Sequence, residues 1–474
     1  MCLNGYDITS SGSEATVVYK DRTFTLCDCK DTGKITRSQD DTADYTGGGV
    51  TVNGTFNMYG GNITGHKLYN NAGVSLENAN AVFNMYGGTV SGNKTTKKSG
   101  INGEGAGVAV NSGTFNMYDG TITGNTADLN GAGVYVYPDG TFTMYNGTIS
   151  GNTAGNNGGG VYVLGTFTME NGTISGNTAK SNSGGVFVSK SNTSVGTFIM
   201  TGGSIIGNNV ENTTSGLGGG VLVNTDAIMK ISGDIEIQNS RKGGTLNEAT
   251  GLYEQGIADN LCLAGSSDGQ TPVTVIGALT GSMPVGISKP VNRMPATGKP
   301  VKIAVGEGYT LKEADIDCFT PDAGSGYRLI YNNDDGALYL ELKPHEHPIC
   351  GENCTHNGTH GNEVWTAIST ASELTTAESK GGFYYLTADI AQGSGWSAWT
   401  PIKDVVLCLN GHSITHNGDK NVINVKKNVT FTLCDCNGSE STRKFTEDKS
   451  GLIAEGGVAA RGEINDPDGV LTGT

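Results

Sequence analysis

Between residues 47 and 237 the chain repeats one pattern of apolar and polar positions. Each copy contains a Val-x-Val piece, a Thr-Phe-x-Met piece and a short piece that ends in Gly-Asn. The anchor aromatic residues are spaced by 27, 32, 27, 25 and 31 residues: Phe56, Phe83, Phe115, Phe142, Phe167 and Phe198. A period of this length is typical of architectures that stack one supersecondary unit per repeat. The pattern therefore predicts a column of stacked repeats, each made of three short strands separated by turns.

Three strands and three turns form one coil of a right-handed parallel β-helix, so the predicted fold class is all-β. Successive side chains in a strand point to opposite faces, and the inward residues of the first repeat are expected to be Val50, Val52, Phe56, Met58 and Ile63. About seven such coils would share one continuous core. Asparagines that recur at one place in the repeat predict a structural side-chain amide ladder: Asn125, Asn152, Asn177 and Asn208.

The opening of the chain returns near its end, and this defines the domain organisation. The stretch from Cys2 to Ile8 matches Cys408 to Ile414, and Thr23 to Cys29 is repeated at Thr430 to Cys436. We therefore predict one module and the start of a second, within a fragment of a longer protein. The predicted segments are 1–46 (N-terminal coils), 47–265 (the β-helix repeat), 266–343 (a β-rich capping segment), 344–362 (a His/Cys-rich linker) and 363–474 (the start of a second β-helix module).

Composition narrows the class of protein further. Glycine accounts for 75 of the 474 residues, roughly twice the usual share, which fits a β protein dense in turns. The formal net charge is −16 and no run of Lys or Arg stands out, so a nucleic-acid partner is not expected. No stretch approaches the length of an apolar membrane span, and none is predicted. As a fragment, the chain is expected to be monomeric and to require no cofactor.

The repeat resembles right-handed parallel β-helix proteins of the pectate-lyase-like superfamily, over about residues 1 to 265. From about residue 344 onward, a His/Cys-rich lead-in followed by YYLTADI, LCLNGHSI and FTLCDC resembles large secreted or surface-anchored proteins of Gram-positive bacteria built from tandem β-helix modules. This resemblance implies an extracellular, secreted or surface-attached protein with an adhesin-like role. Its implied partners are host or microbial glycans.

Six of the ten cysteines lie in the two copies of the opening motif. Cys2 and Cys27 are 25 residues apart, about one coil, and alternation places both, together with Cys29, on the outward side. Neighbouring coils bring such residues within the Cα range of a disulfide. We predict that Cys2 pairs with Cys27 or Cys29, and that Cys408 pairs with Cys434 or Cys436. The alternative is that these residues are buried or free thiols.

The predicted linker concentrates residue types that bind metals: His345, His347, Cys350, Cys354, His356 and His360. Imidazole and thiolate are preferred ligands of zinc, and a small segment without core material can be held together by the metal. The alternative is a Cys350–Cys354 disulfide in a solvated linker. The sequence leaves both interpretations open.

Candidates for catalysis are scarce. Asp119 replaces a glycine of the turn after Tyr118, and Glu170 replaces the tyrosine that recurs at the same place in earlier coils. Hydrolysis of a glycosidic bond needs two carboxylates about 5 to 10 Å apart, which these outward positions would provide if they faced one cleft. The alternative is repeat-to-repeat drift, and no Lys or Arg recurs beside them. The sequence therefore leans against an enzyme.

One outward position carries an aromatic residue in four coils: Tyr59, Tyr86, Tyr118 and Tyr145. Beside it runs a row of amides: Asn57, Asn84 and Asn116. Aromatic faces bordered by amides suit a glycan platform, since sugar CH faces stack on rings while sugar hydroxyls find amide partners. The alternative is that the stacked tyrosines only stabilise the sheet.

The function that joins these features is that of an extracellular bacterial surface protein whose β-helix serves as an adhesion and glycan-contact scaffold. A polysaccharide lyase or glycoside hydrolase on the same scaffold is the alternative, and it would show an acidic cluster with a basic partner in one groove. A purely structural stalk is the third interpretation.

Overall fold

The computed structural model falls into two units, Met1–Leu342 (unit 1) and Lys343–Thr474 (unit 2), and each is described by itself. The residues that the structure describes are 1–11, 15–37, 48–71, 73–98, 100, 102–265, 271–296, 299–324, 326–342, 365–392, 397, 399–409, 412–416, 423, 429–434, 445–448, 451–454, 458–460 and 472–473.

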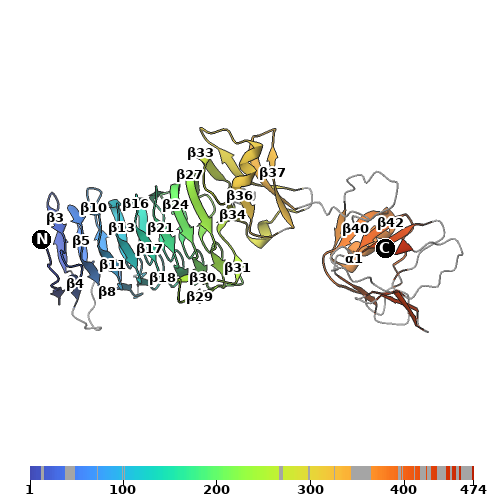
Figure 1. Cartoon of the computed structure of the whole chain (residues 1–474), viewed down its shortest axis with the longest axis horizontal. Helices are drawn as coiled ribbons and strands as arrows, with labels where there is room; N and C mark the ends of the chain where they lie inside the picture. The colour runs from blue at the N-terminus through green and yellow to red at the C-terminus, as the bar shows by residue number, and fades with distance from the viewer. Residues whose placement is uncertain are drawn as a thin grey trace. The chain divides into compact units, whose positions relative to one another are not determined.

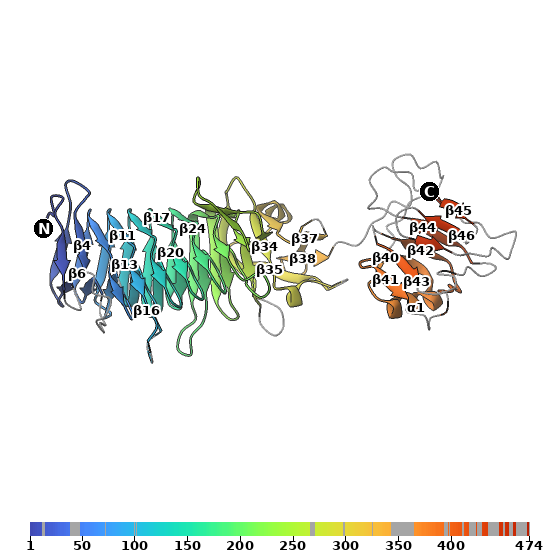
Figure 2. The same cartoon turned by 90° about the horizontal axis from the view of Figure 1, so that it is seen from below.

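Unit 1 is a parallel β-solenoid in which successive coils stack strand upon strand in four rows (Figure 1, Figure 2). The first row consists of β2 (Thr16–Val18), β5 (Val50–Val52), β9 (Val74–Leu76), the first parts of β13 (Val108–Met117) and β16 (Val134–Met144), β19 (Val161–Val163), β23 (Val186–Val188), β26 (Val221–Val223), β32 (Leu261–Leu263), β34 (Val285–Ser288) and β36 (Phe319–Pro321). The second row consists of β3 (Thr23–Leu26), β6 (Thr55–Met58), β10 (Val82–Met85), the remainder of β13 and β16, β20 (Thr166–Met169), β24 (Thr197–Ile206), β27 (Ile228–Gln238), β33 (Val273–Leu279) and β35 (Val301–Gly306).

The two remaining rows are built from shorter strands. The third row consists of β1 (Ile8–Ser10), β4 (Lys34–Arg37), β7 (Asn62–Thr64), β11 (Thr89–Ser91), β14 (Thr121–Thr123), β17 (Thr148–Ser150), β21 (Thr173–Ser175) and the last parts of β24 and β27. The fourth row consists of β8 (Lys67–Leu68), β12 (Lys94–Thr95), β15 (Thr126–Ala127), β18 (Thr153–Ala154), β22 (Thr178–Ala179), β25 (Asn209–Val210), β28 (Arg241–Lys242) and β31 (Ile257–Ala258).

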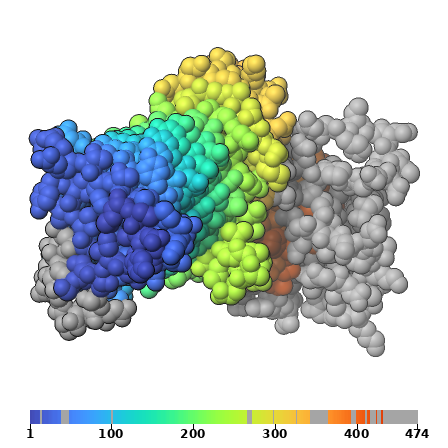
Figure 3. Space-filling model, turned by 60° about the vertical axis from the view of Figure 1, so that its left-hand side comes forward, coloured from blue at the N-terminus to red at the C-terminus, as the bar shows by residue number. Residues whose placement is uncertain are grey.

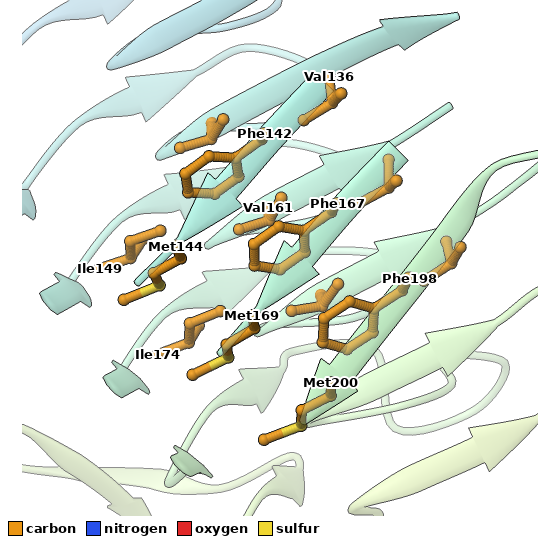
Figure 4. Close-up of a cluster of buried hydrophobic side chains, with 14 of the residues drawn as sticks. Val136, Phe142, Met144, Ile149, Val161, Phe167, Met169, Ile174, Phe198 and Met200 are labelled. Atoms are coloured by element: carbon orange, nitrogen blue, oxygen red, sulfur yellow. The ribbon is translucent and has the colours of Figure 1, made fainter. Parts of the chain in front are cut away.

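The interior of unit 1 is a column of matching apolar residues. Parallel pairing puts Phe56 opposite Phe83 and Met58 opposite Met85, and the same register continues in later coils. The phenylalanine rings of this column lie 4.6 to 5.5 Å apart, and Figure 4 shows three of them with their neighbouring methionines. All five residues expected to point inward in the first repeat are fully buried. The predicted alternation and the all-β parallel class are therefore confirmed.

Two details differ from the prediction. Among the described residues the second row contains ten strands rather than about seven, because β3 precedes the repeat region, and β33 and β35 follow it with apolar inward positions but without the Phe-x-Met signature. Most coils of the repeat also contain a fourth strand of two residues, such as β18, where three strands were expected. Two residues are too few for a periodicity to reveal a strand.

A buried row of asparagines follows the third row of strands. Asn152 Nδ2 donates to Asn177 Oδ1 at 2.9 Å and to the carbonyl of Ile122 at 3.1 Å, and Asn152 Oδ1 accepts from Asn125 Nδ2 at 3.0 Å. The side chains of the row bond in sequence: Asn93, Asn125, Asn152, Asn177 and Asn208. The predicted amide ladder is therefore confirmed, and Asn93 extends it by one residue.

The outward side of the first row of strands carries a second column of apolar side chains, which the sequence pattern did not predict. This covered row consists of Tyr135, Tyr162, Phe187, Leu222 and Cys262. Its aromatic rings lie 4.8 and 4.9 Å apart. Glycine-rich turns pack closely against it, since a Cβ on Gly131, whose φ is +64°, would lie 2.8 Å from the Cβ of Tyr135. Glycine adopts this φ without strain and avoids the contact, although Ser183 stands at the equivalent place before Phe187 with φ 49°.

The C-terminal part of unit 1 changes from parallel to antiparallel pairing. β33, β34 and β36 extend the parallel rows, whereas β38 (Ala337–Leu342) pairs antiparallel with both β35 and β37 (Tyr327–Asn332). The remaining elements of unit 1 are the hairpin of β29 (Thr245–Asn247) and β30 (Leu252–Glu254) and the 3-10 helices η1 (Val291–Arg293) and η2 (Glu313–Cys318). The antiparallel strands end the parallel stacking, as a terminal segment of a solenoid must.

Unit 2 carries the second copy of the opening motif on its own stack of strands. One row of parallel strands consists, in order, of β39 (Thr366–Ile368), β40 (Gly382–Leu386), β42 (Val405–Cys408), β44 (Phe431–Cys434) and β48 (Thr472–Gly473). The other strands are β41 (Ile390–Gln392), β43 (Ile414–His416), β45 (Phe445–Asp448), β46 (Gly451–Ala454) and β47 (Val458–Ala460).

Unit 2 also contains a helix that the all-β expectation missed, α1 (Ala371–Lys380). Its N-cap is Thr370, whose hydroxyl accepts from the backbone N–H of Glu373, and its C-cap is Gly381 with φ 69°. This Thr-x-x-Glu spacing followed by glycine is a start-and-stop signal that sequence can reveal. Within the part of the chain that the structure describes, no helix has the length and apolar character to cross a membrane.

Candidate functional site

Four tyrosines form a regular column on the outside of unit 1, which we call the tyrosine row. Tyr59, Tyr86, Tyr118 and Tyr145 each follow the methionine that ends a strand of the second row. Their ring centroids lie 4.6, 4.7 and 4.7 Å apart and their planes deviate by 10°, 3° and 3°. The side chains are 55%, 38%, 37% and 36% exposed in chain order, so the row lies open to solvent.

The stacking changes which part of each tyrosine is available to a ligand. Rings separated by less than 5 Å cover one another's faces, so the rings of Tyr86 and Tyr118 offer solvent their edges and hydroxyl groups. Tyr59 and Tyr145, at the two ends, each have a ring neighbour on one side only. A phenol is protonated at neutral pH and can donate a hydrogen bond, and burial together with the neighbouring phenols raises the pKa of Tyr86 further. Stacking of sugars on the ring faces, as the sequence suggested, is therefore restricted to the ends of the row.

The amides beside the tyrosine row are partly occupied by one another. Asn84 Nδ2 donates to Asn57 Oδ1 at 2.9 Å, and Asn116 Nδ2 donates to Asn84 Oδ1 at 2.9 Å. An amide group has two N–H donors and two acceptor positions. Each of the three therefore retains hydrogen-bonding capacity beyond the ladder, and all three side chains are partly exposed.

The outward position of the tyrosine row passes to Glu170 in the next coil. Met144 pairs with Met169, so the residues that follow them, Tyr145 and Glu170, occupy equivalent places. At Glu170 a cavity of about 480 Å³ opens on the surface. We call it the acidic groove, and its lining includes Glu170, Asn171, Thr201, Ser204, Asp234 and Glu236.

Carboxylates dominate the charged lining of the groove. Asp234 and Glu236 lie on β27 on either side of the buried Ile235, and Ser204 Oγ donates to Glu236 Oε2 at 2.9 Å. None of the described residues that line the groove is Lys or Arg. The basic partner required of a lyase of this architecture is therefore missing from the described lining.

Asp119, the other sequence candidate for catalysis, is not among the residues that line this groove. Its Oδ1 atom accepts from the backbone N–H of Gly120 at 2.7 Å, so the carboxylate is bonded to its own turn. The structure thus does not bring Asp119 and Glu170 into one cavity.

Sequence reasoning missed Asp234 and Glu236, because their repeat lacks the Phe-x-Met signature. The strand register with the preceding coil identifies them, whereas the repeat motif does not. Asp234 pairs with Gly202 and Glu236 pairs with Ser204, so counting positions from the preceding coil places both on the outward side.

The cysteines of the opening motif come together in both units. Cys2 lies opposite Cys27 across neighbouring strands, and Cys2 Sγ lies 3.0 Å from Cys29 Sγ. In unit 2, Cys408 of β42 lies opposite Cys434 of β44 in the equivalent register. The structure contains no disulfide bond at Cys2, Cys27 or Cys29, and the predicted disulfides stay predictions.

The His/Cys-rich linker, with all six of its candidate ligands, lies outside the described residues, as does Cys436. Among the residues that are described, no group of three or more His, Cys, Asp or Glu side chains is placed to hold a metal ion. The zinc site and the Cys350–Cys354 disulfide therefore stay predictions.

Comparisons of the chain with protein-family models, with curated proteins and with solved structures gave no match. The resemblance to the pectate-lyase-like superfamily and to surface adhesins thus stays an expectation. The β-solenoid, the tyrosine row and the acidic groove are the observations from which a function can be inferred.

Proposed function

We propose that this chain is part of an extracellular surface protein whose solenoid contacts glycans through the tyrosine row and the acidic groove beside it. The observation that carries this proposal is the exposed column of four phenols, which leads directly to a cavity of about 480 Å³. Phenol and amide edges donate and accept hydrogen bonds, as sugar hydroxyls require. The extracellular setting rests on the tandem-module resemblance and on the cysteine content.

The charge of the groove selects among glycans. Its carboxylates include Glu170, Asp234 and Glu236, and the whole chain carries a formal net charge of −16. Like charges across a contact surface suppress the wrong partner. We therefore expect neutral or amino-sugar glycans to bind, and polymers of uronic acids to be rejected.

The test is removal of the hydroxyl groups without loss of the rings. The double variant Tyr118→Phe with Tyr145→Phe keeps the stack, so its fold and stability should match the wild type. Its affinity for a glycan identified on an array should fall at least about tenfold, which is about 1.4 kcal/mol. Tyr118→Ala with Tyr145→Ala should abolish binding. Isothermal titration with the array hit measures both effects.

The control is Tyr19→Phe, which deletes a more exposed hydroxyl from a tyrosine outside the row; Tyr19 is 70% exposed. This control should bind like the wild type. If both double variants also bind like the wild type, the tyrosine row only stabilises the sheet and the proposal fails.

A glycoside hydrolase is the second candidate, and one observation favours it. Asp234 and Glu236 lie two residues apart on one strand and line one groove. Two residues along a strand span about 6.6 Å, which lies within the carboxylate separation of inverting glycosidases, about 6.5 to 9.5 Å. Release of reducing ends from neutral polysaccharides, lost in Asp234→Asn and in Glu236→Gln, would establish it. No product from the wild-type chain would exclude it for the polymers tested.

A further inference from the structure

The N-terminal residues are held against the first coil of unit 1 by its backbone. Leu3 N donates to Cys27 O at 2.9 Å and Cys27 N donates to Met1 O at 2.9 Å, so Cys2 runs alongside Cys27 in parallel. Leu3 is buried, whereas Cys2 and Cys29 are exposed. The first coil forms an end surface of unit 1 (Figure 3, dark blue). The exposed thiols of Cys2 and Cys29 are within reach of a dissolved oxidant.

Asp28, between the two cysteines of the Cys-Asp-Cys motif, joins their turn to the turn that follows Cys2. Its Oδ1 accepts from Gly5 N at 2.7 Å and its Oδ2 accepts from Gly33 N at 2.6 Å. Burial raises the pKa of this carboxyl, but the backbone hydrogen bonds outweigh burial and hold the pKa below its ordinary value. The ionised Asp28 thus ties the Cys-Asp-Cys turn to the Cys-Leu-Asn-Gly turn.

The geometry distinguishes the two candidate partners of Cys2. Directly paired residues of parallel strands stand about 4.8 Å apart with side chains that run side by side, whereas a disulfide needs Cβ atoms about 3.8 Å apart. Cys27 is such a direct partner, and its Sγ lies 3.3 Å from the Met1 carbonyl oxygen. Cys29 lies beyond the strand, in the turn, and its Sγ is 3.0 Å from Cys2 Sγ.

We propose that Cys2 and Cys29 form a disulfide that closes the first coil, that Asp28 is its positioning residue, and that Cys27 stays a free thiol. The bond ties the N-terminal segment to the turn after β3. The second unit repeats the motif in sequence, with Cys408 at the position that corresponds to Cys2.

The oxidation balances with a dissolved disulfide such as oxidised glutathione. The hydrogen bond from Cys29 lowers the pKa of Cys2, so the Cys2 thiolate is the first nucleophile. It attacks one sulfur of glutathione disulfide, forms a mixed disulfide and releases one glutathione thiolate. Cys29 then loses its proton to solvent, attacks the Cys2 sulfur and releases the second glutathione. Two protein thiols are oxidised and one glutathione disulfide is reduced.

The experiment uses the full chain equilibrated in a glutathione redox buffer, alkylated and digested with trypsin. We expect the peptide of residues 1–20 to be joined to the peptide of residues 23–30, with one alkylated cysteine in the second peptide. Fragmentation between the two cysteines of that peptide should place the alkyl group on Cys27. Cys27→Ser should keep the cross-link, and Cys29→Ser should lose it or form it many times more slowly.

Asp28→Asn tests the positioning role. It should slow formation of the cross-link several-fold while the circular dichroism spectrum stays that of the wild type, and Asp31→Asn in the same turn is the matched control. Three results would overturn the proposal: alkylation of all three thiols in the wild type, fragmentation that places the alkyl group on Cys29, or a cross-link that survives in Cys29→Ser at the wild-type rate. The fragmentation result decides the pairing even if a variant does not fold.

Discussion

The covered row and the tyrosine row follow the same rule of construction in different surroundings. In both, parallel register repeats an aromatic residue at one outward place, and the rings stack 4.6 to 4.9 Å apart. Phe187 of the covered row is 5% exposed, whereas Tyr118 of the tyrosine row is 37% exposed. Stacking therefore follows from repetition and does not by itself indicate a ligand. Exposure is the property that separates a packing column from a contact surface.

The amides show the same contrast. The ladder that contains Asn152 is fully buried, and its members bond both to each other and to backbone carbonyls. The outer ladder of Asn57, Asn84 and Asn116 is half-buried, and water can replace any partner it loses. We therefore expect the covered row and the buried amide ladder to contribute most to stability. The tyrosine row and the outer amide ladder remain available to bind a ligand.

Asn152→Leu should give the largest loss of stability. The leucine removes the acceptor of Asn125 N and Nδ2 and the side-chain donor to Ile122 O, whereas Asn177 Oδ1 keeps the backbone N–H of residue 152 as a donor. Each buried polar group left without a partner costs about 1 to 3 kcal/mol. Three groups lose a partner, so the expected decrease in the free energy of unfolding is about 3 to 9 kcal/mol, measured by urea denaturation.

The matched variant in the open ladder is Asn84→Leu. Solvent reaches the neighbouring amides there, so the loss should stay below about 1 kcal/mol. Equal losses of unfolding free energy in Asn152→Leu and Asn84→Leu would contradict the distinction between the buried and the outer amide ladder.

Phe187→Ala should have the next largest effect. Phe187 stacks on Tyr162 and packs on Leu222 and Cys262, and truncation of a buried aromatic residue costs about 3 kcal/mol or more. Tyr118→Ala in the tyrosine row should cost about 1 kcal/mol, since it loses stacking but little burial. Urea denaturation midpoints of the two variants measure the difference in stability, provided that the free energy of unfolding depends equally on urea concentration in both. A larger loss for Tyr118→Ala would mean that the tyrosine row is the structural one.

The sequence predicts the inward residues and the buried ladder because both obey a short period. Val50, Phe56 and Asn152 recur at fixed places, and a parallel stack converts such recurrence directly into contacts. The covered row was not predicted, because alternation along the strand assigns its aromatic residues to the solvent side. Only the structure shows that turns cover them. Gly131 is an example. Its lack of a side chain lets the turn pack on Tyr135, but a glycine in a turn does not by itself predict that the turn covers an aromatic residue.

The candidate site was predicted in part, for a related reason. The tyrosine row is a repeated position and is visible in the sequence, whereas the acidic groove depends on residues that occur once. Glu170 was noticed because it interrupts a repeat. Asp234 and Glu236 were not, because the repeat that carries them has lost its anchor phenylalanine. Asp119, which interrupts the repeat in the same way as Glu170, lies outside the groove, so an interruption alone does not mark a site.

The buried amide ladder begins next to a histidine, His66, whose pKa differs between the folded and the unfolded chain. His66 occupies the place before Asn93, to which its backbone N–H donates, and its Nε2 lies 3.2 Å from the Ile35 carbonyl. Burial, with a smaller contribution from the charge of Arg37, lowers the pKa of His66 from 6.5 to about 4. The unfolded chain therefore binds a proton that the folded chain excludes, and stability must fall as pH drops from about 6.5 towards 4.

His66→Asn replaces the imidazole by the amide found in the next coils and removes this titration. Between pH 7 and pH 5 the wild type should lose about 2 kcal/mol more than the variant in free energy of unfolding. The buried carboxyl of Asp322, whose pKa burial raises to about 6, responds in the opposite direction, but it is present in both proteins and cancels in the difference. Urea denaturation at the two pH values measures the effect. Parallel pH profiles would show that His66 is solvated and that the covered ladder is open at this end.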